Sequence, residues 1–128
     1  MNLEKVVFGF FVLLSATLNF GYVTGDISDP MHHNAIELYA AVVVNIIATV
    51  LKLGDRTQIG AIHLATSLVA VIQLAAATVT WVWASEATQG GVTPYLMSSV
   101  VSLALGAVLA NVVSVVLLVI ETANFRRR

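Results

Sequence analysis

The run ATQGGVTPYLMSSVVSLALGAVLANVVSVVLLVI, residues 87–120, contains no charged side chain. A helix needs roughly 20 mainly apolar residues to cross the hydrocarbon core of a bilayer, so this run is long enough for one span. The uncharged runs 6–25 and 57–85 are long enough in the same way. The uncharged run 38–51 is shorter, but a single helix over 30–53 would carry Glu37 and Lys52 to opposite headgroup layers.

The chain therefore reads as an all-α polytopic membrane protein, with one membrane domain over its 128 residues. The four spans are predicted at residues 5–24, 30–53, 58–85 and 94–122. The sequence is 59% hydrophobic and 10% charged, far less charged than a soluble domain. Its net charge of −1 argues against a nucleic-acid partner. It has no cysteine, and it lacks a nucleophile–base pair, a hydrolytic metal motif and a cofactor fingerprint, so neither an enzyme nor a cofactor is expected.

The positions of the basic residues predict the orientation. With four spans, all six fall on one side of the membrane: Lys5, Lys52, Arg56, Arg126, Arg127 and Arg128. The two opposite connections carry Asp26, Asp29 and Glu86 and no Lys or Arg. The positive-inside rule then places both termini in the cytoplasm of a bacterial inner membrane. The first run could alternatively be a cleaved secretory signal, although Glu4 weakens its positive start and no clean cleavage site follows.

An internal repeat relates the two halves of the chain. The segment ATLNFGY, residues 16–22, aligns with ATVTWVW, residues 77–83, and AVVVNIIATVL, residues 41–51, aligns with AVLANVVSVVL, residues 107–117. The second alignment places Asn45 over Asn111. Both halves also start a helix with a capping residue before proline, at Asp29-Pro30 and Thr93-Pro94. We interpret the chain as two similar helical hairpins related by a pseudo-twofold axis along the membrane normal.

The segment LNFGYVTGD, residues 18–26, resembles the filter loop of potassium channels. Its repeat counterpart has no filter character, and unwound backbone at this depth would need shielding by protein. We therefore expect a helix that ends near Gly25, with Phe20 and Tyr22 in the interfacial aromatic belt.

Amide and imidazole side chains inside the spans form the first candidate site. An unpaired amide in hydrocarbon costs several kcal/mol, so these groups are expected to face the bundle or a partner subunit. They either hydrogen-bond between helices as structural glue or line a polar path for a small cation or solute. These residues are Asn19, Asn45, His63, Gln73 and Asn111. Span four adds a face of small residues suited to close helix packing: Ser102, Gly106, Ala110 and Ser114.

The connection before the second span forms another candidate site. It gathers acids and imidazoles that could bind a divalent metal ion or another ligand, without a standard metal-binding spacing. The alternative is a solvated acidic cap, in which Asp29 caps the second span and the acids favour its positive end. His33 and Glu37 would share one helix face. The candidate ligands are Asp26, Asp29, His32, His33 and Glu37.

The segments LNFGYVTGDISDP (18–30), NAIELYAAVVVN (34–45) and LKLGDRTQIGAIHLATS (51–67) are similar to a group of short proteobacterial four-helix inner-membrane proteins, some labelled as potassium-channel proteins. That resemblance implies an inner-membrane location and brings no catalytic or binding residue with it. We expect a non-enzymatic membrane protein, an oligomeric scaffold or accessory subunit of a transport system. A small channel or transporter is the alternative. The expected partners are lipid and further copies of the chain, with another membrane protein as an alternative.

Overall fold

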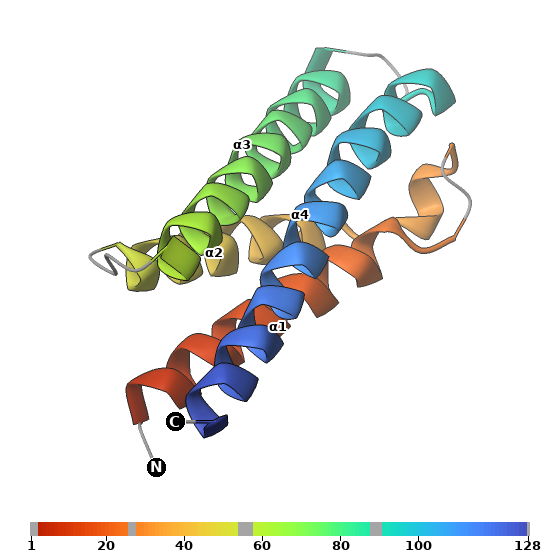
Figure 1. Cartoon of the computed structure of the whole chain (residues 1–128). Coiled ribbons are helices and arrows are strands. Elements are labelled where there is room, and N and C mark those ends of the chain that lie inside the picture. The colour runs from red at the N-terminus through yellow and green to blue at the C-terminus, as the bar shows by residue number, and fades with distance from the viewer. Residues whose placement is uncertain (1–2, 26–27, 54–57, 88–90, 128) are drawn as a thin grey trace.

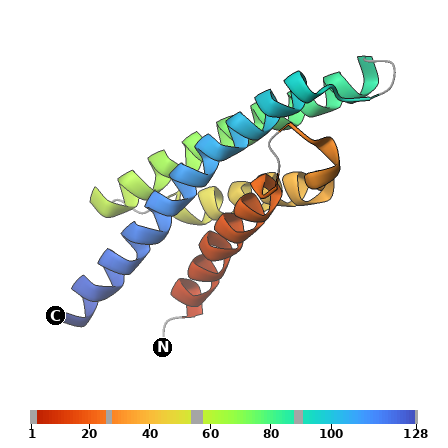
Figure 2. The same cartoon turned by 90° about the vertical axis from the view of Figure 1, so that its right-hand side faces the viewer.

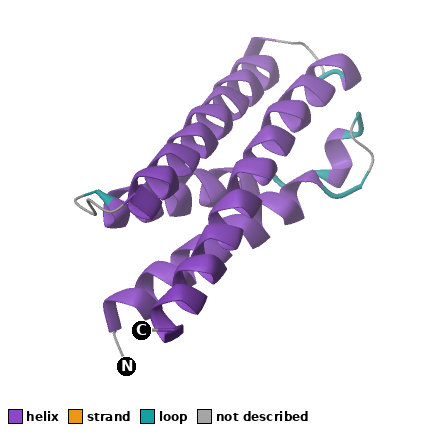
Figure 3. Cartoon of the chain, viewed as in Figure 1, coloured by secondary structure: helices purple, strands orange, loops and turns teal. Residues whose placement is uncertain are grey.

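The computed structural model describes residues 3–25, 28–53, 58–87 and 91–127, without the side chains of His32, Ile59 and residues 124–127. Every regular element in these residues is helical, and none is a strand (Figure 3). The elements are α1 (Leu3–Val23), the short 3₁₀ helix η1 (Pro30–His32), α2 (Ala35–Lys52), α3 (Gln58–Ala87) and α4 (Pro94–Arg127). The predicted all-α fold with four long helices is confirmed.

All four α-helices are long and apolar enough to cross a membrane. At 1.5 Å per residue, α1 and α2 are about 32 and 27 Å long, close to the thickness of the hydrocarbon core. On the same rise, α3 and α4 reach about 45 and 51 Å, so they must tilt or project beyond the core. The chain is therefore a small membrane protein with four candidate spans.

The helices form two hairpins that pack side by side. The most extensive contacts join α3 to α4 and α1 to α2, and α1 also packs on α4 and α2 on α3. In the second hairpin, α3 and α4 run alongside each other, whereas α1 and α2 diverge from their connection toward the end that holds the chain termini (Figures 1 and 2). This end, which carries Lys5 and Lys52, is called the basic end below. The opposite end, which carries Asp29, Glu37 and Glu86, is called the acidic end.

Two apolar clusters fill the interior. The larger lies toward the acidic end and combines small residues of α3 and α4 with a few large side chains, among them Tyr22, Leu38, Leu74 and Met97. The smaller lies toward the basic end and consists of Phe8, Val12 and Ala48, with Phe11, Val115 and Leu118 packed against it. Alanine at the α3–α4 contact allows those two backbones to approach closely, which explains why this hairpin is the tighter one.

The second span differs from the predicted helix over residues 30–53. His33 and Asn34 are extended, which separates η1 from α2. Asp29 caps η1 by accepting from the Met31 N–H at 2.9 Å, and Asn34 caps α2 by accepting from the Ile36 N–H at 2.9 Å. Pro30 starts only the short helix η1, and Asn34 then caps a new helix. The second span thus begins at Ala35, because the Asn34 side chain satisfies a backbone N–H at that point.

The end of α1 settles the question of the filter-like segment. The chain is helical through Val23, and Gly25 has a positive φ of 92°, as expected for a helix exit. Phe20 is 61% exposed, in keeping with a lipid-facing position, but Tyr22 is 1% exposed. The belt prediction for Tyr22 was wrong, because residues two apart on a helix point to nearly opposite sides.

The repeat is visible in the order of elements but not in detailed contacts. Thr93 caps α4 as predicted, since its hydroxyl accepts from the Leu96 N–H at 3.2 Å. The Asp29 of the first half instead caps η1. The aligned Asn45 and Asn111 contact different partners, and the two hairpins open to different extents (Figure 2).

Candidate functional site

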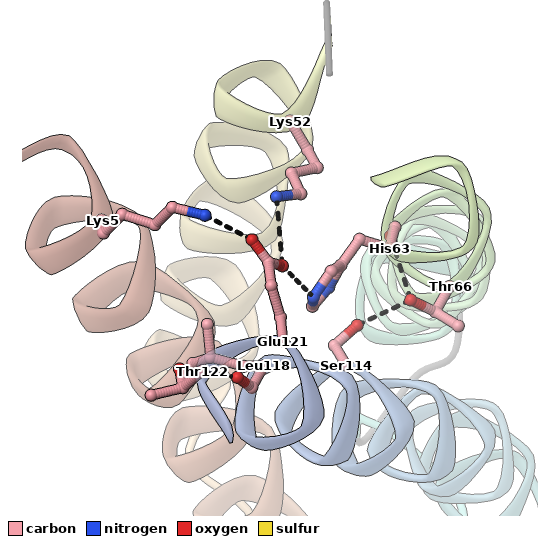
Figure 4. A network of polar contacts seen from close by, with 8 residues as sticks. All are labelled: Lys5, Lys52, His63, Thr66, Ser114, Leu118, Glu121 and Thr122. Carbon is pink, nitrogen blue, oxygen red and sulfur yellow. Dashed lines mark hydrogen bonds and ion pairs between the residues drawn. The ribbon is translucent and has the colours of Figure 1, made fainter. Parts of the chain in front are cut away.

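One carboxylate at the basic end contacts side chains from the three other helices (Figure 4). Glu121, near the end of α4, accepts a hydrogen bond from Lys5 of α1 through Oε1. Its other oxygen, Oε2, lies 3.7 Å from Nζ of Lys52 on α2 and 3.7 Å from Nε2 of His63 on α3. These four side chains are called the Glu121 cluster below. Polar groups from all four helices meet in this cluster.

The Glu121 cluster is largely shielded from solvent. The exposed fractions of the side chains are 54% for Lys5, 19% for Glu121, 7% for Lys52 and 0% for His63. Burial of a charge is costly unless it is paired, so Lys52 and Glu121 depend on each other in this environment. The Oε2 atom itself is buried and has no hydrogen bond among the described residues.

Phe8 of α1 closes the cluster on its apolar side. The Lys52 Nζ lies 4.5 Å from the centroid of the Phe8 ring, in cation–π geometry. The His63 ring meets the same phenyl ring edge-on, with centroids 5.4 Å apart and an interplanar angle of 86°. Phe8 thus separates the charged groups from the apolar cluster that it forms with Val12 and Ala48.

A hydroxyl pair next to the cluster joins α3 to α4. Thr66 Oγ1 and Ser114 Oγ are 2.7 Å apart, and Thr66 also donates to the His63 carbonyl at 3.0 Å (Figure 4). Thr66 therefore holds the backbone of His63 from within α3, the helix that also directs the His63 ring toward Glu121. His63 and Ser114 are both buried inside the bundle.

The sequence contains the signal for this cluster, although the prediction did not use it. Lys5 and Lys52 were interpreted as determinants of orientation and His63 as part of a polar stripe, and no role was assigned to Glu121. In an up-down arrangement of four helices, however, the start of α1, the end of α2, the start of α3 and the end of α4 all lie at one end. A carboxylate among lysines at that end would have pointed to an ion pair.

Two of the predicted stripe residues contact each other in the middle of the bundle. Asn19 of α1 is fully buried, and Asn111 of α4 is 3% exposed. In the amide orientation that satisfies both side chains, Asn19 Nδ2 donates to the Ala104 carbonyl at 3.0 Å, and Asn19 Oδ1 accepts from Asn111 Nδ2 at 3.0 Å. This pair links the two hairpins and corresponds to the predicted interhelical glue.

The other amides are placed differently. Asn45 is buried and donates to the Ala41 carbonyl of its own helix at 2.8 Å. Gln73 of α3 rests on Gly106 of α4, where any Cβ would collide with the amide. Within the described residues, Gln73 Oε1 is buried and has no hydrogen bond. Gly106 leaves room for the Gln73 amide, whereas Ser102 of the predicted small face is exposed.

Two residues of the predicted metal or ligand site at the acidic end, Asp29 and His33, contact nearby backbone. His33 is 5% exposed, and its Nδ1 lies 2.6 Å from the Tyr22 carbonyl oxygen, which ties the turn to the end of α1. Because His33 precedes α2, it does not share a helix face with Glu37, and that prediction was wrong. Asp29 caps η1 rather than the second span. Asp26 and the side chain of His32 lie outside the described residues. Among the residues that the structure describes, no group of three His, Asp or Glu could hold a metal ion.

Residues 32–122 match the model of a family of unknown function, DUF6394. The chain belongs to DUF6394. The matched segment contains Lys52, His63 and Glu121, and Lys5 precedes it. No curated protein and no solved structure matches the chain. Two of the three segments that carried the sequence resemblance, 34–45 and 51–67, lie within the DUF6394 match, and the proteobacterial source stays an expectation from the sequence.

Proposed function

We propose that this DUF6394 protein is a non-enzymatic, oligomeric scaffold or accessory subunit of a membrane transport system. The observation that carries the proposal is the Asn19–Asn111 pair. Two amides that could have lined a path instead bond to each other and to a backbone carbonyl, which joins the hairpins. Such contacts contribute about 0.6–2 kcal/mol each to helix association.

The outer surface supports association within a bilayer. Each helix carries large apolar side chains that are mostly exposed, for example Phe10 on α1, Val50 on α2, Ile72 on α3 and Leu109 on α4. In a membrane these faces pack on lipid or on helices of other subunits. We further propose that the protein lies in a bacterial inner membrane with both termini in the cytoplasm. Lys5 and Lys52 at one end of the bundle support this orientation.

Measurement of subunit number and of ion flux tests this function. The purified protein, reconstituted in nanodiscs, is expected to contain more than one copy per particle or to retain a second membrane protein after mild extraction. In proteoliposomes it should give no flux of potassium, sodium or protons above that of protein-free vesicles. A strictly monomeric protein without a retained partner would contradict the proposal, and so would flux through the chain alone.

A channel or transporter is the second candidate, and the position of Gln73 favours it. The buried Oε1 atom of Gln73 has no hydrogen bond within the described part of the chain. Such an amide oxygen is costly in a bundle and is available to a passing ion or solute. The proposed path is lined by Asn45, His63, Gln73 and Asn111. If this function is correct, flux disappears in Gln73→Leu and in Asn45→Leu while the protein stays folded. Ser102→Leu, at an exposed position of α4, is the matched control and should conduct like the wild type.

A further inference from the structure

Gln73 of α3 is a polar side chain in the middle of a candidate span. It is the fourteenth of the 28 residues in the span Gly60–Ala87, so in a bilayer its amide lies near the centre of the hydrocarbon core. Its Oε1 atom is buried, and among the described residues the amide makes no hydrogen bond. Since hydrocarbon offers neither a donor nor an acceptor, this amide needs a partner from outside the described chain.

The contact with α4 places the amide near the surface of the α3–α4 hairpin. A Cβ on Gly106 would collide with Oε1, Cδ and Nε2 of Gln73, so the amide occupies the space that a side chain at this position would take. A glycine has no side-chain donor, so this contact leaves the amide oxygen unpaired. Gln73 as a whole is only partly buried. The amide therefore lies at the edge of the contact between the two helices, within reach of a neighbouring molecule.

Exposed residues flank this amide on both helices. On α3, Val69 and Ala76 lie one turn to either side of Gln73 on the same face, and both are exposed. On α4, Ser102 lies one turn from Gly106 and is exposed as well. Small residues such as these allow another backbone to approach closely, and helix contacts in membranes are enriched in them. The five residues are called the Gln73 face below.

We propose that the Gln73 face binds a second copy of this chain and that the two Gln73 amides hydrogen-bond to each other across a twofold axis. A primary amide carries both donors and an acceptor, so it is complementary to itself. When the axis runs along the membrane normal, residues beside it meet their own copies at equal depth. The terminal torsion of glutamine is soft, so each amide can turn from Gly106 toward its partner.

The chemistry of the amide favours a second copy over other occupants. A lipid tail has no polar group to offer. A passing ion or solute, as in the second candidate function, would leave the amide unpaired between passages, at a cost that a permanent pair removes. A different membrane protein would need a matching polar group at the same depth, which a second copy always carries. This inference rests on the proposed oligomeric function and adds to it the face through which two copies meet.

Cysteine cross-linking in lipid vesicles tests the Gln73 face, since the chain has no cysteine of its own. Ala76→Cys lies on this face. Ala75→Cys is the matched control, because Ala75 is the adjacent, exposed alanine and points to nearly the opposite side of α3 from Gln73. With copper-phenanthroline as the oxidant, Ala76→Cys should form a disulfide-linked dimer and Ala75→Cys should not. A disulfide requires the two Cα atoms to lie within about 7 Å of each other.

Gln73→Leu tests the amide pair itself. In the Ala76→Cys background it should suppress the cross-link while the helical circular dichroism stays unchanged. The dissociation constant of the dimer, measured by energy transfer between copies labelled at Val50→Cys during dilution into lipid, should rise by about tenfold after the loss of two interhelical hydrogen bonds. Val79→Leu, at an exposed position on another side of α3, should change neither result.

The proposal is overturned if Ala75→Cys cross-links as readily as Ala76→Cys, or if the Gln73→Leu protein associates like the wild type. In the second case, loss of ion flux in Gln73→Leu would assign the amide to a conducting path instead. Counting subunits in nanodiscs separates these results from a failure of the scaffold function. If the particles still hold several copies or a second membrane protein, only the Gln73 face is wrong, whereas a strictly monomeric protein without a retained partner contradicts both proposals.

Discussion

At the basic end of the bundle, side chains from α1, α2 and α3 converge on the carboxylate of Glu121. At the acidic end, by contrast, Asp29, His33 and Asn34 contact nearby backbone. Asp29 and Asn34 each accept from an N–H two residues ahead, and His33 bonds the end of the preceding helix. The basic end therefore connects helices that are distant in sequence, and the acidic end shapes one connection.

The two ends also differ in the kind of polar interaction that they contain. Local caps satisfy orphan backbone groups and can form as soon as their own turn forms. The Glu121 cluster exists only when all four helices are packed, and its buried members stabilise the bundle only as long as each keeps its partners. We expect substitutions at the basic end to affect the whole bundle and those at the acidic end to affect one turn.

The largest effect is expected for Glu121→Gln. The change keeps the shape of the side chain but removes the negative charge that Lys52 contacts in its nearly dehydrated position. The free energy of unfolding in detergent micelles should fall by about 3 kcal/mol, as for a broken buried ion pair. Glu86→Gln, at an exposed position of the acidic end, is the control and should change it by no more than about 0.5 kcal/mol. Equal losses in both variants would remove the distinction between the two ends.

A smaller effect is expected for the lysines, and it should differ between them. Lys52→Ala removes a buried ammonium group and its contact with Phe8, so a loss of about 2 kcal/mol is expected. Lys5→Ala removes a pair that is half exposed, so the loss should stay within about 1 kcal/mol. Raising the salt concentration from 50 to 500 mM should shrink the Lys5 effect and leave the Lys52 effect nearly unchanged, since buried pairs are poorly screened. The opposite order of salt sensitivity would show that Lys52 is not shielded.

The smallest effects are expected for the caps of the acidic end. Asn34→Ala should cost about 1 kcal/mol, because it removes the cap of a span. Asp29→Ala should cost less than Asn34→Ala, because the helix η1 that Asp29 caps has only three residues. Hydrogen exchange at the amides of Ile36 and Met31 measures each cap separately. A larger loss in Asp29→Ala would mean that the second span begins at Pro30 after all.

Prediction from the sequence succeeded where a property depends on neighbouring residues. The uncharged runs gave the four long helices, and Thr93 was correctly predicted to cap α4. It failed where two local signals competed. Pro30 and Asn34 both favour a helix start, and the pattern could not show that the second one begins the span. It also failed for Tyr22, since aromatic residues near a span end are compatible with either the belt or the core.

The sequence by itself determined where the chain can cross a bilayer and which end of the bundle is basic, because hydropathy and charge are summed along the chain. The tertiary structure alone decided which polar side chains meet. Each residue turns a helix by about 100°, so the partner of a buried group depends on the rotation of every helix about its own axis. That rotation is set by packing across the whole bundle. It turns Asn19 toward Asn111, turns Asn45 toward its own helix, and brings Lys5, Lys52 and His63 to Glu121.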